Sequence, residues 1–195
     1  SRTKVLTTPP VYFPSVTTRS VYVGISMSRS VDFRRIMRSD MHDSLRFTTS
    51  LKVTPDMIEV VDLARLGAGE IDALMIPGGF GAAKNLSSFA VEGKDCSVDP
   101  DLVRLLRNMN QAGKPIGALC IAPAVVAAVF GSDLHPEITI GSDEGTAEAL
   151  ESMGAKHIKT PVSDIVVDRN NKIVTNACYM LATRISEVAN GAEQV

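Results

Sequence analysis

The chain has 195 residues, of which 45% are hydrophobic and 22% charged, and its formal net charge is −2. This size and composition suit one soluble globular domain, and no apolar stretch is long enough to insert into a membrane. Three cysteines without a CxxC pair, together with only three histidines, argue against a disulfide framework and against a structural zinc site. We therefore expect a reducing compartment and no bound metal.

The small net charge hides an asymmetry along the chain. Residues 1–50 hold eight basic and three acidic residues, a net charge of +5. The remainder of the chain holds twelve basic and nineteen acidic residues, a net charge of −7. The first acidic residue is Asp32, and the stretch before it is rich in Ser and Thr. Such an N-terminus is typical of an organelle transit region, with a basic arm on a cytoplasmic protein as the alternative. Because aromatic residues are sparse, nucleic acid is not an expected partner.

The first third of the chain has no clear helical period. Prolines predict an extended N-terminal arm over residues 1–20, followed by a single domain over residues 21–195. Strands are expected at residues 21–25 and 44–53. A helix is expected to begin at Thr54, with Pro55 at its first position, and to continue to Leu66.

The remaining two thirds alternate between short apolar runs and helical patterns. Further strands are expected at residues 71–76, 114–119 and 138–140, with a hairpin formed by residues 164–168 and 172–175. Helices are expected at residues 99–113, 121–130, 146–153 and 179–189. Near-continuous apolar strands alternating with helices predict an α/β fold, a flavodoxin-like three-layer sandwich with a mostly parallel sheet.

Cys120 lies between the expected strand at residues 114–119 and the apolar helix that follows it. A side chain at such a corner is lifted out of the sheet, as in a nucleophile elbow. The helix N-terminus favours an anion, so the corner favours the thiolate form of Cys120. The alternative is a buried structural cysteine.

A glycine-rich turn follows the expected strand at residues 71–76. It contains Gly78, Gly79 and Gly81, and Lys84 and Asn85 come directly after it. Ligands of open α/β sheets bind at the carboxyl ends of strands, and glycine amides there can bind an oxyanion. The turn matches neither a P-loop nor a dinucleotide fingerprint. Lys84 and Asn85 could orient a substrate carboxylate or could be solvated, and a turn needed only for packing is the alternative for the whole segment.

Four blocks of the sequence together resemble one family. They are IDALMIPGGFGAAKNLSSFAVEGKDC, QAGKPIGALCIAPAVVAAVF, ITIGSDEGTAEALESMGAKH and DIVVDRNNKIVTNACYMLA. This pattern resembles the ElbB family (enhancing lycopene biosynthesis proteins), in the PfpI-type branch of the class I glutamine amidotransferase-like superfamily. The resemblance implies a flavodoxin-like, usually dimeric protein without a cofactor, which is mitochondrial in eukaryotes and acts on small aldehydes as a glyoxalase or deglycase.

The resemblance assigns roles to three positions. Cys120 matches the nucleophile, and Gly79 matches the glycine whose backbone N–H faces it. With the N–H of Ile121, Gly79 would form an oxyanion hole. In a glyoxalase cycle the thiolate would attack the aldehyde, a general base would move a proton between the two carbons, and water would release the hydroxy acid.

One part of the family pattern is missing. Family members carry a glutamate after their first strand that serves as the proton shuttle, whereas here no glutamate precedes Glu59. Asp32 or Glu59 could substitute, although nothing marks either. The rival prediction is therefore a catalytically impaired relative that serves as a structural or accessory subunit of a larger assembly. A third, redox-sensing role for Cys120 is also open.

Several other residues invite functional hypotheses that the sequence does not favour. His135 and Glu137 imitate the dyad of true glutamine amidotransferases but follow the elbow by only one helix, so a turn is expected. His157 is expected to be solvated. The other expected roles are a loop thiol for Cys96, a small packed hydrophobe for Cys178, a surface site for His42, and helix capping or a solvated turn for Asp143 and Glu144.

Overall fold

The computed structural model describes residues 3–7, 23–25 and 58–195, and for the residues before Leu63 it describes the backbone alone. The strand expected at residues 44–53 lies outside these ranges, as do Asp32 and His42. Residues Thr3–Thr7 form a strand inside the range expected to be an N-terminal arm. The division between an arm and a domain at residues 20 and 21 stays a prediction.

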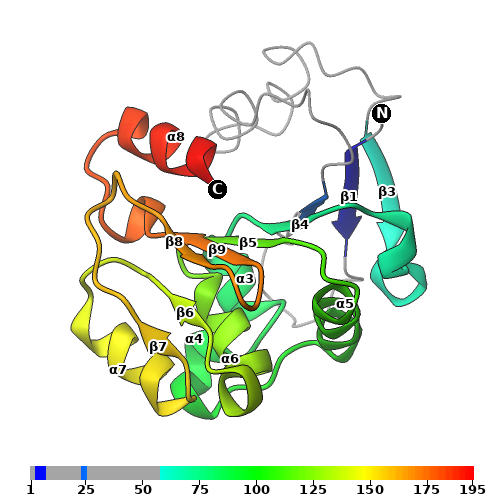
Figure 1. The fold of residues 1–195 in the computed structure, drawn as a ribbon, viewed down its shortest axis with the longest axis horizontal. Helices are drawn as coiled ribbons and strands as arrows, with labels where there is room; N and C mark the ends of the chain where they lie inside the picture. The colour runs from blue at the N-terminus through cyan, green and yellow to red at the C-terminus, as the bar shows by residue number, and fades with distance from the viewer. Residues whose placement is uncertain (1–2, 8–22, 26–57) are drawn as a thin grey trace, which may run out of the picture.

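A seven-stranded sheet in the order β3-β1-β2-β4-β5-β9-β8 forms the centre of the described structure (Figure 1). Its strands are β1 Thr3–Thr7, β2 Val23–Ile25, β3 Ile58–Asp62, β4 Leu74–Ile76, β5 Ile116–Leu119, β8 Val166–Asp168 and β9 Ile173–Asn176. Strands β1, β3, β4, β5 and β9 run in one direction, and β2 and β8 run against their neighbours. The predicted mostly parallel α/β sheet is confirmed.

Helices cover both faces of this sheet (Figure 1). They are α3 Phe80–Lys84, α4 Phe89–Glu92, α5 Pro100–Gln111, α6 Pro123–Leu134, α7 Glu144–Ser152 and α8 Ile185–Gln194, with the short 3-10 helices η2 Leu63–Arg65, η3 Ala68–Glu70, η4 Gly93–Asp95 and η5 Cys178–Met180. The larger core lies under α5 and α6, where Phe130 and Leu105 are fully buried. On the other face, Val188 and Ala192 of α8 pack on Leu119 of β5.

Three sequence predictions were wrong in element type or extent. The helix expected from Thr54 is instead strand β3, because the β-branched residues Ile58, Val60 and Val61 favour an extended segment that pairs along β1. The strand expected at residues 138–140 is β6 Glu137–Ile138, which pairs with β7 Lys156–His157 outside the main sheet. The last helix does not begin near residue 179, because η5 occupies that position and α8 starts at Ile185.

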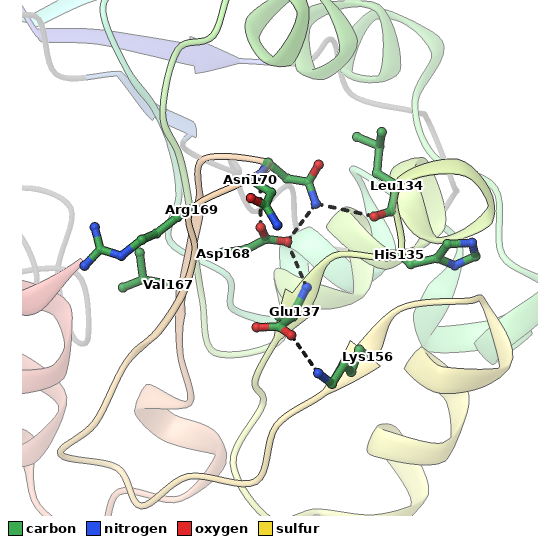
Figure 2. Close-up of a pocket in the computed structure, with 9 residues that line it drawn as sticks. Leu134, His135, Glu137, Lys156, Val167, Asp168, Arg169 and Asn170 are labelled. Atoms are coloured by element: carbon green, nitrogen blue, oxygen red, sulfur yellow. Dashed lines mark hydrogen bonds and ion pairs between the residues drawn. The ribbon is translucent and has the colours of Figure 1, made fainter.

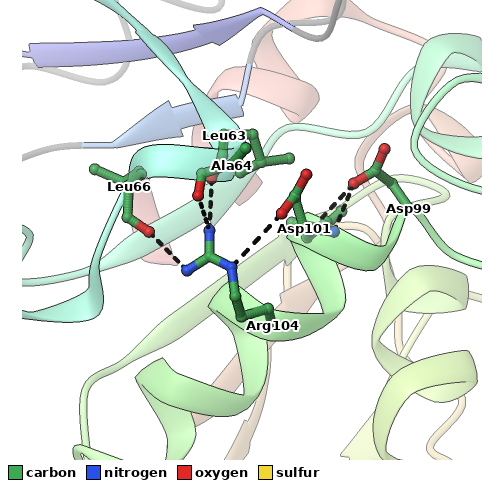
Figure 3. A network of polar contacts seen from close by, with 7 residues as sticks. Leu63, Ala64, Leu66, Asp99, Asp101 and Arg104 are labelled. Atoms are coloured by element: carbon green, nitrogen blue, oxygen red, sulfur yellow. Dashed lines mark hydrogen bonds and ion pairs between the residues drawn. The ribbon is translucent and has the colours of Figure 1, made fainter.

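Helix α5 shows how local sequence and tertiary contacts combine. Asp99 caps it by accepting hydrogen bonds from the N–H groups of Asp101 and Leu102 at 2.9 and 3.2 Å. One turn later Arg104 donates to the carbonyls of Leu63, Ala64 and Leu66, so that its guanidinium closes the turn after β3 (Figure 3). The helix therefore fixes the segment that connects β3 to β4.

Candidate active site at the carboxyl end of β5

Cys120 is the first residue after β5, and its backbone is left-handed, with φ of 58°. A residue other than glycine rarely adopts this conformation, and its strain is typical of functional corners. Its N–H donates to the carbonyl of Asn176, the last residue of β9, at 3.0 Å. The structure thus places Cys120 at the carboxyl edge of the sheet on a sharp strand-to-helix corner, partly exposed.

The glycine turn after β4 packs directly against this corner. A Cβ atom on Gly78 would lie 2.3 Å from the carbonyl oxygen of Leu119 and 2.9 Å from the Cβ of Cys120. A Cβ on Gly79 would meet no atom of the described residues within 4 Å. Both glycines have positive φ, 85° and 75°. Gly78 is needed for close approach, and Gly79 for a conformation that side chains disfavour.

Some backbone N–H groups at the corner have no hydrogen-bond acceptor among the described residues. Helix α6 begins at Pro123, later than expected, and the N–H groups of Ala122, Ala124 and Val125 bond to nearby carbonyls. Within the described ranges, the N–H of Ile121 finds no acceptor, and neither does that of Gly79. Unbonded backbone N–H groups near a thiol can stabilise an oxyanion. The role of Ile121 and Gly79 in an oxyanion hole stays a prediction.

Three residues at the same edge were not assigned a role at the site from sequence. They are Asn176, which closes β9, and Cys178 and Tyr179, which follow it in η5. Burial raises the pKa of the Tyr179 hydroxyl, and the charges of Cys178 and Cys120 raise it further. The parallel pairing of β5 with β9 brings them to the site, because carboxyl ends of parallel strands meet at one edge, and the sequence analysis made no prediction of strand order.

No carboxylate of the described side chains forms a hydrogen bond with Cys120. The backbone of Glu59 lies on β3, which is separated from β5 by β1, β2 and β4. At about 4.8 Å between neighbouring strands this amounts to about 19 Å. Glu59 therefore does not lie beside the thiol, and the geometry marks no described carboxylate as a substitute for the missing family glutamate.

Lys84 and Asn85 lie at the far end of the short helix α3. Lys84 is exposed, and its ammonium stands 5.8 Å from the centre of the Phe80 ring. Because α3 starts at Phe80, right after the glycine turn, it carries Lys84 about one turn away from the corner. Substrate binding by these two residues stays a prediction that the geometry does not support.

A polar hollow of about 450 Å³ lies at the opposite edge of the sheet (Figure 2). The turn between β8 and β9 lines it, at the amino end of β9. Cys120 follows the carboxyl end of β5, which runs parallel to β9, so the hollow and the thiol lie at opposite edges of the sheet. His135 contacts the carbonyl of Gly154 at 2.8 Å, and Glu137 pairs with Lys156 at 2.7 Å. The pair that imitates the amidotransferase dyad therefore lies far from the thiol and has structural partners.

The remaining candidates have local roles. Cys96 is partly buried, which raises the pKa of its thiol, and Glu92 and Asp95 also raise it. Asp143 caps α7 by accepting from the N–H of Thr146 at 2.9 Å. His157 is not fully solvated: burial lowers its pKa, and its Nε2 lies 3.4 Å from the N–H of Ile140.

The described side chains contain no cluster of three or more residues suited to hold a metal ion. No helix in the same part of the chain is long and apolar enough to cross a bilayer.

Comparison with known proteins places this geometry in context. The chain is 44% identical over 142 residues to the human protein named glutamine amidotransferase-like class 1 domain-containing protein 3, mitochondrial, covering 68% of this chain and 52% of that protein. It is 34% identical over 158 residues to the ES1 protein, mitochondrial, of Danio rerio, and the match covers 75% of this chain and 56% of that protein. The chain thus spans about half the length of these relatives. No family model matches it.

A solved structure supports the same relationship. The isoprenoid biosynthesis protein with amidotransferase-like domain from Ehrlichia chaffeensis superposes with a TM-score of 0.62 at 31% identity, covering 77% of this chain and 64% of that one. The mitochondrial names of both relatives agree with the organellar location predicted from the N-terminal composition. The narrower ElbB assignment stays a prediction. The chain is therefore a homologue of the mitochondrial ES1 proteins, and it belongs with the glutamine amidotransferase-like class 1 domain proteins.

Proposed function

We propose that this protein is a cofactor-independent enzyme of mitochondria that acts on small reactive aldehydes through Cys120, as a glyoxalase or deglycase. The observation that carries the proposal is the left-handed backbone of Cys120 at the strand-to-helix corner, with Gly78 packed against it. His135 and Lys172 share the left-handed backbone, so it is the combination of this corner with the closely packed glycine turn that supports a functional role for Cys120.

The corner offers the parts that addition to a carbonyl requires. Cys120 supplies the sulfur nucleophile, which becomes a hemithioacetal when it attacks one aldehyde carbon of glyoxal. The negative charge that develops on the carbonyl oxygen would be met by the N–H groups of Ile121 and Gly79. No described atom lies within 4 Å of the position that a Cβ on Gly79 would take, which leaves room there, among the described residues, for a small substrate.

The proton transfer between the two substrate carbons needs a base. Tyr179 lies at the same edge, but its raised pKa keeps the phenol protonated at neutral pH, which suits an acid better than a base. The proposal therefore assigns the base to none of the described side chains. A hydroxy acid is then released when water attacks the thioester formed by the proton shift.

Glyoxal consumption by the purified protein tests this function. We expect turnover to glycolate, and we expect Cys120→Ser to reduce kcat/KM by about 10³-fold or more, the scale of losing a nucleophile. Cys96→Ser is the matched control, since Cys96 lies in the loop after η4 and should leave the rate unchanged. Absence of turnover in the wild type, or full activity of Cys120→Ser, would disprove the proposal.

A catalytically impaired accessory subunit is the second candidate. It is favoured by the absence of any glutamate before Glu59 and by the lack of a described carboxylate at the thiol. The two functions differ in their expected assembly, because an enzyme of this kind is proposed to be a homodimer. Light scattering after gel filtration of the purified chain distinguishes a stable dimer from a monomer that awaits a larger protein partner.

A further inference from the structure

A single residue holds both cysteines of the carboxyl edge. The carbonyl oxygen of Asn176 accepts the N–H of Cys120 at 3.0 Å, and its side-chain oxygen accepts the N–H of Cys178 at 2.7 Å. The amide nitrogen of Asn176 donates to the carbonyls of Val162 and Asp164 at 2.9 and 2.7 Å. Asn176 is fully buried, so this clamp fixes the backbone of Cys120 relative to that of Cys178.

The two thiols also share a packing environment. Cys178 has no exposed surface and forms a cluster with Leu119, Val188 and Ala192, against which Cys120 packs. Leu119 pairs with Asn176 in the parallel ladder of β5 and β9, so the cysteines follow neighbouring strands by one and two residues. Such strands lie about 4.8 Å apart, within the Cα separations that a disulfide bridges. Both cysteines have left-handed backbones, with φ of 58° and 42°.

Electrostatics links the same two sulfurs. Burial raises the pKa of the Cys178 thiol to about 12, and a negative charge on Cys120 contributes to this rise. The backbone N–H of Cys120 acts in the opposite direction by stabilising the Cys178 thiolate. Cys178 therefore stays protonated at neutral pH. Removal of the charge on Cys120 would lower the pKa of Cys178.

We propose that Cys178 is the resolving thiol of Cys120, and that hydroperoxides convert the two into an intramolecular disulfide. The Cys120 thiolate attacks a peroxide oxygen, so that an S–O bond forms, the O–O bond breaks, and an alkoxide or hydroxide leaves and takes up a proton from the solvent. Cys120 becomes a sulfenic acid, oxidised by two electrons, and the peroxide is reduced. The sulfur of Cys178 then attacks that of Cys120. An S–S bond forms, the S–O bond breaks, and hydroxide leaves with the Cys178 proton as water.

The order of these steps follows from the charges. The sulfenic acid is neutral, so the repulsion that opposes ionisation of Cys178 disappears when its target forms. The disulfide withdraws the nucleophile reversibly and spares Cys120 from irreversible oxidation to the sulfinic acid. The inference requires a reactive Cys120 but does not require aldehyde turnover.

Peptide mass mapping of the full chain after treatment with hydrogen peroxide tests this pair. We expect a Cys120–Cys178 crosslink with the loss of two hydrogens, two fewer titratable thiols, recovery with dithiothreitol, and a free Cys96. In Cys178→Ala, we expect sulfinic acid on Cys120 to increase by about tenfold or more, because the capturing thiol is gone. Cys96→Ser is the matched control and should still form the crosslink.

Peptide mass mapping of the wild-type chain tests the Cys120–Cys178 disulfide even if Cys178→Ala fails to fold. Sulfinic acid on Cys120 beside a free Cys178, a crosslink that uses Cys96, or an unoxidised Cys120 would each overturn the inference. Peroxide treatment is done without aldehyde, and glyoxal turnover is measured on reduced protein without peroxide. A failure of the proposed enzyme activity is thus distinguishable from a failure of the thiol pair.

Discussion

Substitution of Gly78 by alanine tests how the elbow is built. The new Cβ would lie 2.3 Å from the Leu119 carbonyl oxygen and 2.9 Å from the Cys120 Cβ, contacts that real Cβ atoms essentially never make. Both neighbours belong to the backbone of the corner or are attached directly to it, so no flexible side chain can rotate away. Either β4 and β5 separate, or the left-handed turn at Cys120 changes.

The size of the effect follows from two contributions. Alanine at φ of 85° costs about 1–2 kcal/mol in backbone strain. Relief of the overlap adds about 1–3 kcal/mol, the usual cost of overpacking a close contact. We therefore expect Gly78→Ala to lower the free energy of unfolding by about 2–5 kcal/mol. Gly79→Ala is the matched control, because Gly79 also has positive φ but its Cβ would meet no described atom within 4 Å.

Urea denaturation of the wild type and both variants measures this difference, and the rate of Cys120 labelling by a thiol reagent reports the state of the corner. Gly78→Ala should be less stable than Gly79→Ala by about 1–3 kcal/mol, the part that comes from overlap alone. It should also change the labelling rate of Cys120 more. Equal destabilisation of the two variants, with equal labelling, would refute the idea that Gly78 positions the nucleophile.

Two further substitutions test the scaffold. Burial would raise the pKa of Asp168, but hydrogen bonds from Asn171, Glu137 and Asn170 outweigh it and hold this pKa below its ordinary value. The ionised carboxylate thus stabilises the fold above about pH 4, and this contribution is lost as the pH falls further. Asp168→Asn should cost about 1–3 kcal/mol at neutral pH and weaken the acid dependence of urea unfolding, whereas an unchanged acid dependence would contradict the assignment. Arg104→Met removes three hydrogen bonds to carbonyls and, allowing for partial solvent screening, should cost about 1–3 kcal/mol in thermal unfolding. The control Asp101→Asn, which breaks only an exposed ion pair of 3.6 Å, should cost less than about 0.5 kcal/mol; a similar loss in both would show that the ion pair dominates.

Local sequence rules were sufficient where the signals were local. Asp99 and Pro100 predict the start of α5, and Gly113, with φ of 65°, lies just past its end. The hairpin of β8 and β9 and the corner at Cys120 were predicted from apolar runs and turn residues. Where two signals competed, the tertiary pairing decided. Residues 54–66 carry a helix start and a loose helical period, yet pairing along β1 makes their middle part a strand.

The sequence by itself determined that Cys120 stands at a strand-to-helix corner and that a glycine turn ends an earlier strand, because each strand and the segment after it are contiguous in the chain. Tertiary structure alone decided which glycine approaches the thiol, since that depends on how close β4 comes to β5. It also decided that Asn176 and Cys178, more than fifty residues later in the sequence, join Cys120 at one edge. Contacts between parallel strands depend on register and strand order, and neither is written in the periodicity of a single segment.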